Sequence, residues 1–240
     1  MARTIAIIGA LEKEVARIHD ALADHTVTHE AGLEVAHGSL GDLDVVATVA
    51  GMGTVNAAAA AQHLISSYHP EAIVFSGIAG GLNPALHIGD VVVGGRLRYL
   101  DTDTALVAES APGLEEFDSS PALIEAAANA LSAHGFIDAA SSEADGTGAQ
   151  FLLGTIATGD RFITGADKDT VVEATHADCV EMEGAAVAHV AAKNGTPCLV
   201  LRAISDNCDE SYVDLSHRSF DLEEYARTAS ELVLSILRAL

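Results

Sequence analysis

Val180-Glu181-Met182-Glu183-Gly184 (residues 180–184) is the stretch around which the chain is organised. It stands where an extended segment gives way to an Ala-rich helical segment, so we expect a strand end followed by a helix start. Because strand side chains alternate, Glu181 and Glu183 should point to one side and Met182 to the other. Taken alone, the stretch is also explained as an acidic helix N-terminus, where glutamates complement the helix dipole.

The size and composition of the chain indicate a densely packed α/β protein. It has 240 residues, of which 49% are hydrophobic, so we expect a single domain over residues 1–240. No apolar run reaches the roughly eighteen residues of a membrane-spanning helix. Residues 1–4 pass into a short apolar run without a signal-peptide cleavage pattern. The sequence therefore predicts a soluble, untargeted protein of the cytoplasm.

The charge of the chain argues against several classes of partner. Twelve basic residues stand against 35 acidic ones, which gives a formal net charge of −23. Nucleic acid and anionic membranes are therefore unfavourable partners, and a small-molecule substrate fits better. Cys179, Cys198 and Cys208 lie in or beside apolar segments without CxxC spacing, so we expect reduced thiols that hold no metal.

Strand and helix signals alternate along the chain. Short apolar runs predict strands at residues 4–8, 33–39, 43–49, 72–76, 91–99, 151–158 and 197–205. Helical patterns cover residues 11–22, 55–68, 121–134, 168–174, 184–194 and 221–240. Gly41-Asp42 predicts a hairpin turn, whereas residues 104–120 are expected to be polar and irregular. The alternation favours a largely parallel sheet covered by helices on both faces.

Five segments that follow predicted strand ends carry the residues of interest. In such sheets ligands bind beyond the carboxyl ends of the strands, so these segments should converge on one rim. They are residues 9–14, 77–81, 159–163, 181–183 and 205–206. Arg202 also brings a charge into a strand that should be buried, and a buried arginine usually needs a carboxylate partner.

Several common site types find no support in the sequence. The glycines of residues 77–81 lack both GxGxxG and a Walker lysine, so dinucleotide and nucleoside triphosphate binding fit poorly, and turn glycines remain an ordinary explanation. The eleven histidines include no HExxH motif, and no serine stands in a GxSxG elbow. We therefore expect neither a metal nor a cofactor.

Five motifs, taken together and in order, span nearly the whole chain. They are Gly9-Ala10-Leu11-Glu12-Lys13-Glu14-Val15, Gly77-Ile78-Ala79-Gly80-Gly81-Leu82, Gly159-Asp160-Arg161-Phe162-Ile163, Val180-Glu181-Met182-Glu183 and Arg202-Ala203-Ile204-Ser205-Asp206. This set resembles the 5′-methylthioadenosine/S-adenosylhomocysteine nucleosidases of the nucleoside phosphorylase superfamily. The resemblance implies a three-layer α/β/α fold with a mixed, barrel-like central sheet, commonly in a homodimer. It also implies hydrolysis of a 5′-modified purine nucleoside to adenine and the modified ribose, as in methionine salvage.

The resemblance implies separate roles for the acidic residues. Cleavage of a purine N-glycosidic bond needs protonation of a poor leaving group and a placed water. Asp206 would protonate the purine at N7, with Ser205 orienting it. Glu14 would be the base that polarises the attacking water, with Arg202 near that water. Glu183 would accept hydrogen bonds from the ribose 2′- and 3′-hydroxyls, as an ionised carboxylate can.

Apolar side chains complete the implied substrate pocket. Met182 would lie under the ribose, and Phe162 and Ile163 would frame the base. Met52 and Phe220 are candidate walls, since nucleoside sites are mostly apolar with few polar anchors. The remaining substrate-binding candidates of the glycine-rich loop are Ile78, Ala79 and Gly80, while Glu181 is expected to have only a supporting role.

Two departures from the family pattern leave the substrate open. The family's loop usually reads GSAGG, but Ile78 stands at its serine position and cannot donate a hydrogen bond. The stretch after residues 99–103 lacks the aromatic segment that often reaches across the dimer to the 5′ substituent. A futalosine-type nucleoside hydrolase is therefore an alternative.

Two other classes of function also compete with hydrolysis. A phosphorolytic purine nucleoside phosphorylase would place arginines around phosphate, whereas Glu14 occupies the water site here. A non-catalytic nucleoside-binding module could keep the fold and lose turnover. Pure binding would have no need of Glu14, Glu183 and Asp206 together.

Overall fold

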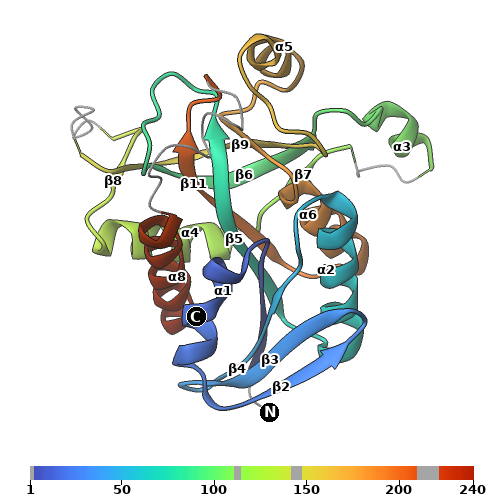
Figure 1. Ribbon diagram of the computed structural model, residues 1–240, viewed down its shortest axis with the longest axis vertical. Coiled ribbons are helices and arrows are strands. Elements are labelled where there is room, and N and C mark those ends of the chain that lie inside the picture. Colours follow the sequence, from blue (N-terminus) through green and yellow to red (C-terminus); the bar gives the residue numbers. More distant parts are fainter. Residues whose placement is uncertain (1–2, 111–114, 142–147, 210–221) are drawn as a thin grey trace.

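A computed structural model describes residues 3–110, 115–141, 148–209 and 222–240 of the protein (Figure 1). The strands are β1 (Arg3–Gly9), β2 (Ala23–Glu30), β3 (Leu33–Leu40), β4 (Leu43–Val49), β5 (Ala72–Gly81), β6 (Val91–Tyr99), β7 (Phe117–Asp118), β8 (Ile137–Asp138), β9 (Gln150–Thr158), β10 (Cys179–Glu181) and β11 (Cys198–Asp206). The helices are α1 (Glu12–Ala21), α2 (Thr54–Tyr68), α3 (Thr104–Ser110), α4 (Pro121–Ala133), α5 (Ala166–Thr175), α6 (Gly184–Asn194) and α8 (Leu222–Ala239).

The central sheet is mixed and partly closed. Within the described residues, its strands follow the order β10-β9-β6-β11-β5-β1-β4-β3-β2, with β7 beside β6 and β8 beside β9. Because β10 also pairs with β5, the strands β10, β9, β6, β11 and β5 close into a barrel. The mixed, barrel-like sheet that the family resemblance implies is therefore confirmed.

Helices cover the sheet on both faces. Along β5, Ile73 and Phe75 pack with α2 and α6, whereas Ala72 and Val74 pack on the side of α1, α4 and α8. This division follows from the alternation of strand side chains, which makes a continuously apolar run face two helical layers at once. Figure 1 shows α2 and α6 on one side of the sheet, and α1, α4 and α8 on the other.

Parallel pairing gathers several strand ends at one place. β1 runs parallel to β4 and β5, and β11 runs parallel to β5. The end of β1 at Gly9, the second half of β5 from Gly77 to Gly81 and the end of β11 at Asp206 therefore lie at the same edge of the sheet. No helix in the described part of the chain is long and apolar enough to cross a membrane.

Four features of the fold differ from the sequence predictions. Residues 77–81 do not follow a strand end, because β5 continues through them to Gly81. The sheet is not largely parallel, because β11 is antiparallel to β6 and β10 is antiparallel to β5. β2 was not predicted; it is an edge strand of mostly exposed side chains and lacks an apolar run. Residues 104–120 are not irregular throughout, since they contain α3 and β7. Both elements are too short to show a clear hydrophobic period.

Candidate active site

A cavity of about 380 Å³ opens at the edge where the strand ends gather. Twelve of the thirteen residues proposed from the sequence line it: Glu14, Met52, Ile78, Ala79, Gly80, Phe162, Ile163, Met182, Glu183, Arg202, Ser205 and Asp206. The thirteenth, Phe220, lies outside the described residues. Lining residues that sequence reasoning did not single out as substrate contacts are Ala10, Leu11, Gly77, Arg161, Val180, Glu181 and Cys208.

Arg202 is the buried positive charge at the floor of the site. Its side chain is 1% exposed, and Nε donates to Glu181 Oε2 at 3.0 Å while Nη2 contacts the same oxygen. Its guanidinium carbon lies 4.2 Å from the centroid of the Phe75 ring. Burial disfavours the charge, but the carboxylates of Glu181, Glu183 and Glu14 outweigh this effect and raise the pKa of Arg202. The arginine therefore stays charged.

Glu181 also fixes the backbone that begins α6. Its Oε2 accepts the N–H groups of Glu183 at 3.0 Å and Gly184 at 2.7 Å. Its Oε1 accepts the hydroxyl of Thr158, whose oxygen in turn accepts the Ala185 N–H at 2.8 Å. The sequence predicted only a supporting role for Glu181. Its contacts with Arg202 and Thr158 join three strands that are far apart in the chain, so no local pattern indicates them.

The predicted alternation of Glu181, Met182 and Glu183 is wrong. β10 ends at Glu181, and Glu183 has φ −139° and ψ −36°, so the extended conformation does not continue through the motif. All three side chains line the cavity as a result. Glu181 turns towards Arg202, whereas Glu183 turns towards the segment before α2.

Glu183 presents one carboxylate oxygen to the cavity. Its Oε1 accepts the Gly53 N–H at 2.8 Å, while its Oε2 lies 3.9 Å from Arg202 Nη2, beyond hydrogen-bond distance. Burial, and after it the neighbouring Glu181 carboxylate, raises the pKa of Glu183 to about 7. A side chain held in this way can accept hydrogen bonds from a ligand on its second oxygen.

Glu14 is held by the turn that begins α1. Its Oε2 accepts the N–H groups of Ala10 at 2.7 Å and Leu11 at 2.9 Å, and the side chain is buried. Desolvation by burial raises the pKa of Glu14, although these backbone N–H groups and Arg202 oppose the shift. A buried carboxylate with a raised pKa is suited to take up a proton.

Gly77 marks the place where Glu14 and Arg202 approach each other. A β-carbon added there would lie 3.0 Å from Glu14 Oε1 and 3.3 Å from Arg202 Nη1. Only glycine leaves this space open to a small polar molecule. A carboxylate that accepts and a guanidinium that donates are the partners that would hold and orient a water.

Asp206 has a donor group at each carboxyl oxygen. Cys208 N–H donates to Oδ1 at 2.9 Å, and the Ser205 hydroxyl oxygen lies 2.8 Å from Oδ2 and 3.1 Å from the Ala79 carbonyl. The hydroxyl of Ser205 and the N–H of Cys208 therefore fix the orientation of the Asp206 carboxyl group.

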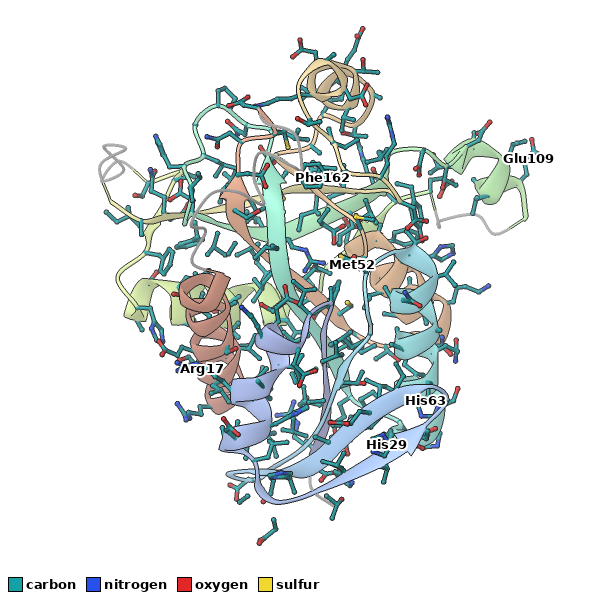
Figure 2. All side chains as sticks on the ribbon, in the orientation of Figure 1. Arg17, His29, Met52, His63, Glu109 and Phe162 are labelled. Atoms are coloured by element: carbon teal, nitrogen blue, oxygen red, sulfur yellow. The ribbon has the colours of Figure 1, made fainter. Side chains whose placement is uncertain are left out.

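Apolar side chains form the mouth of the cavity. Met52 is 62% exposed and precedes α2, and Phe162 is 40% exposed and follows β9 (Figure 2). Ile163 is buried beside them, and Met182 follows Glu181 on the cavity wall. No group of three or more His, Cys, Asp or Glu in the described ranges is placed to bind a metal ion. The site combines an apolar cleft with four carboxyl groups and Arg202.

Known proteins share this fold. A family model described as the phosphorylase superfamily matches residues 4–239. The 5′-methylthioadenosine/S-adenosylhomocysteine nucleosidase of Bacillus subtilis is 36% identical over 241 residues, covering 98% of this chain and 98% of that protein. The chain belongs to this nucleosidase family. The identification made from the five sequence motifs is confirmed.

Solved structures of relatives superimpose over the full chain. The nucleosidase of Colwellia psychrerythraea in complex with adenine has a TM-score of 0.86 at 31% identity, covering 100% of this chain and 96% of that chain. The futalosine hydrolase of Helicobacter pylori has a TM-score of 0.85 at 28% identity, covering 100% and 99%. The nucleosidase family and the futalosine hydrolases thus share one fold, so the fold alone does not separate their substrates.

The pairing of Arg202 with Glu181 can be tested by a double-mutant cycle. We expect Arg202→Met and Glu181→Gln each to lower the free energy of unfolding by about 3–5 kcal/mol, because each leaves a buried partner uncompensated. The double variant should lose less than the sum. Urea unfolding of the four proteins measures both effects.

An exposed ion pair supplies the control for that cycle. Arg3 Nε lies 2.8 Å from Glu71 Oε2 with both side chains about half exposed, so Glu71→Gln should cost at most about 1 kcal/mol. Equally small losses in the Arg202 and Glu181 variants would contradict the proposed importance of the buried pair.

Proposed function

We propose that the protein hydrolyses the N-glycosidic bond of 5′-methylthioadenosine and S-adenosylhomocysteine, releasing adenine and the 5′-modified ribose. The observation that carries the proposal is the convergence of Glu14, Glu183 and Asp206 on one apolar cavity. Curated relatives that are 33–37% identical bear the name of this nucleosidase, which favours these substrates over futalosine. Futalosine hydrolase is the related alternative.

Each polar group has a place in the proposed reaction. Asp206 donates its proton to N7 as the bond between C1′ and N9 breaks, and the electron pair leaves with the purine. Glu183 Oε2 accepts the ribose hydroxyls and holds the sugar against Met182. Water held between Glu14 and Arg202 adds to C1′ and gives its proton to Glu14. Phe162 and Ile163 frame the base, and Met52 closes the mouth of the cavity.

The charges around the proposed water position support hydrolysis over phosphorolysis. Arg202 is already paired with Glu181, and the carboxylates of Glu14 and Glu183 lie beside it. A phosphate bound there would be repelled by these negative charges, and within the described residues the two arginines of the cavity lining are already paired, Arg202 with Glu181 and Arg161 with Asp167. A water molecule is neutral, so the carboxylates do not repel it.

We extend the proposal to the setting in which the enzyme works. It is a single domain over residues 1–240, forms a cytoplasmic homodimer, acts in methionine salvage and binds neither nucleic acid nor membranes. Free, buried Cys179, Cys198 and Cys208 suit a reducing compartment. Exposed Leu106 and Met52 are apolar surface of the kind that subunit contacts cover.

Chromatography of the released base tests the function directly. The purified protein is incubated with 5′-methylthioadenosine, S-adenosylhomocysteine and futalosine, each with and without phosphate. We expect free adenine from the first two at a rate that does not depend on phosphate. Release that requires phosphate would establish phosphorolysis, and release from futalosine alone would establish the alternative substrate.

Two substitutions separate the proposed acid from the proposed base. We expect Asp206→Asn to abolish turnover while keeping nucleoside affinity within about tenfold, because it removes the transferable proton and keeps the shape. Glu14→Gln should lose turnover to a similar degree. Steady-state rates and calorimetric binding of 5′-methylthioadenosine measure these effects. Near-normal turnover in either variant would remove that residue from its assigned role.

The ionisation of Glu183 should appear in the pH profile. Its pKa is raised to about 7, so the carboxylate that accepts two ribose hydroxyls is present above that pH and is lost below it. We expect kcat/KM for 5′-methylthioadenosine to fall as the pH drops through about 7. The residual activity of Glu183→Gln should lack this step. If kcat/KM of Glu183→Gln still fell at the same pH, a group other than Glu183 would be responsible for the fall.

A further inference from the structure

Asp160 joins two loops on opposite sides of the cavity mouth. It lies between β9 and α5, and its Oδ1 accepts the backbone N–H of Thr54 at 2.7 Å. Its Oδ2 accepts the Thr54 hydroxyl at 2.5 Å. Thr54 is the first residue of α2 and lies 106 positions away in the chain. One carboxylate thus ties the loop after β9 to the start of α2.

The residue before Thr54 holds the proposed ribose anchor. Gly53 donates its N–H to Glu183 Oε1 at 2.8 Å, and its φ of +97° is accessible mainly to glycine. The position of this N–H depends on where the first turn of α2 lies. Asp160 fixes that turn, because Gly53 offers no side chain of its own to cap the helix. A chain of contacts therefore runs from Asp160 through Thr54 and Gly53 to Glu183.

The contact between Asp160 and Thr54 also fixes the two apolar side chains at the cavity mouth, Phe162 and Met52, relative to each other. Phe162 stands two residues after Asp160, and Met52 stands two residues before Thr54. Both walls line the cavity. A shift of either loop relative to the other would change the mouth of the cavity and the orientation of Glu183 together.

We propose that Asp160 is a positioning residue for recognition of the ribose hydroxyls, acting on Glu183 through Thr54 and Gly53. This inference rests on the proposed function, in which Glu183 Oε2 binds the sugar. Without Asp160, the Gly53 N–H no longer holds Oε1 in place, and Oε2 loses its fixed direction. The loss of kcat/KM should therefore be largest for substrates that carry both ribose hydroxyls. A cap that served stability alone would affect all substrates equally.

The pH profile gives a second readout of the same contact. The Gly53 N–H lowers the pKa of Glu183 against the larger effect of burial. Weakening this bond should therefore move the acid limb of kcat/KM to higher pH. Loss of thermal stability alone would not move that limb.

The test compares variants on two substrates, 5′-methylthioadenosine and its 3′-deoxy analogue. We expect Asp160→Ala to reduce kcat/KM for the first by about tenfold or more, as for a lost contact to a charged group, and for the analogue by much less. Asp160→Asn keeps an acceptor for the Thr54 N–H, so it should retain most of the preference for 5′-methylthioadenosine over the analogue, measured as the ratio of their kcat/KM values. Thr54→Val removes only the hydroxyl contact, and its ratio should lie between those of the two Asp160 variants.

An aspartate away from the cavity provides the matched control. Asp138, in β8, also accepts a backbone N–H, that of Ala140 at 2.9 Å, and it is exposed and absent from the cavity lining. Asp138→Asn should leave kcat/KM for both substrates unchanged. Equal losses on both substrates in Asp160→Ala, with an unmoved acid limb, would overturn the positioning role.

Failure of the proposed function remains distinguishable from failure of this inference. Absence of turnover in the unmodified protein would overturn the hydrolase assignment alone. In that case calorimetry of 5′-methylthioadenosine and its 3′-deoxy analogue measures the same discrimination by affinity. A ratio of affinities that is unchanged by Asp160→Ala would then contradict the positioning role by itself.

Discussion

The buried ion pair between Arg202 and Glu181 is the interaction on which the rest of the site depends. It joins β11 to the end of β10 inside the barrel, where neither charge is stable without the other. Since Glu181 also accepts the N–H groups of Glu183 and Gly184, the pair determines where α6 begins. The glutamate of the proposed ribose contact is therefore positioned by its neighbour. A motif that first looks like two equivalent acids contains one structural anchor, Glu181, and one proposed ligand group, Glu183.

The carboxyl groups of the site differ because their surroundings differ. Glu14 is buried and held by backbone N–H groups, and its pKa is raised. Asp206 is instead oriented by the Ser205 hydroxyl and the Cys208 N–H. The two carboxyl groups therefore have different surroundings, as their separate proposed roles require. Among the described residues, Arg202 is the cation closest to the proposed water position and is already paired with Glu181, so the surrounding negative charge favours the proposed water over a phosphate.

Much of the fold and the location of the site could be predicted from the sequence. The apolar run of β5 showed a strand buried on both faces, and the strand-end rule placed five segments at one edge. Only the family resemblance predicted the mixed sheet formed by β6, β10 and β11. The alternation of side chains within a strand does not indicate whether its neighbour runs parallel or antiparallel. Contacts of Asp160 with Thr54 and of Glu183 with Gly53 were not predictable, since they span 106 and 130 positions without a shared motif.

The central claim is that Glu183, Asp206 and the Glu14–Arg202 pair bind three different parts of one nucleoside and its attacking water. A crystal structure of the Asp206→Asn variant with 5′-methylthioadenosine tests it most directly. The account predicts ribose hydroxyls on Glu183 Oε2, purine N7 beside residue 206 and an ordered water between Glu14 and Arg202. A nucleoside bound with its ribose away from Glu183, or with the base turned from residue 206, would contradict it.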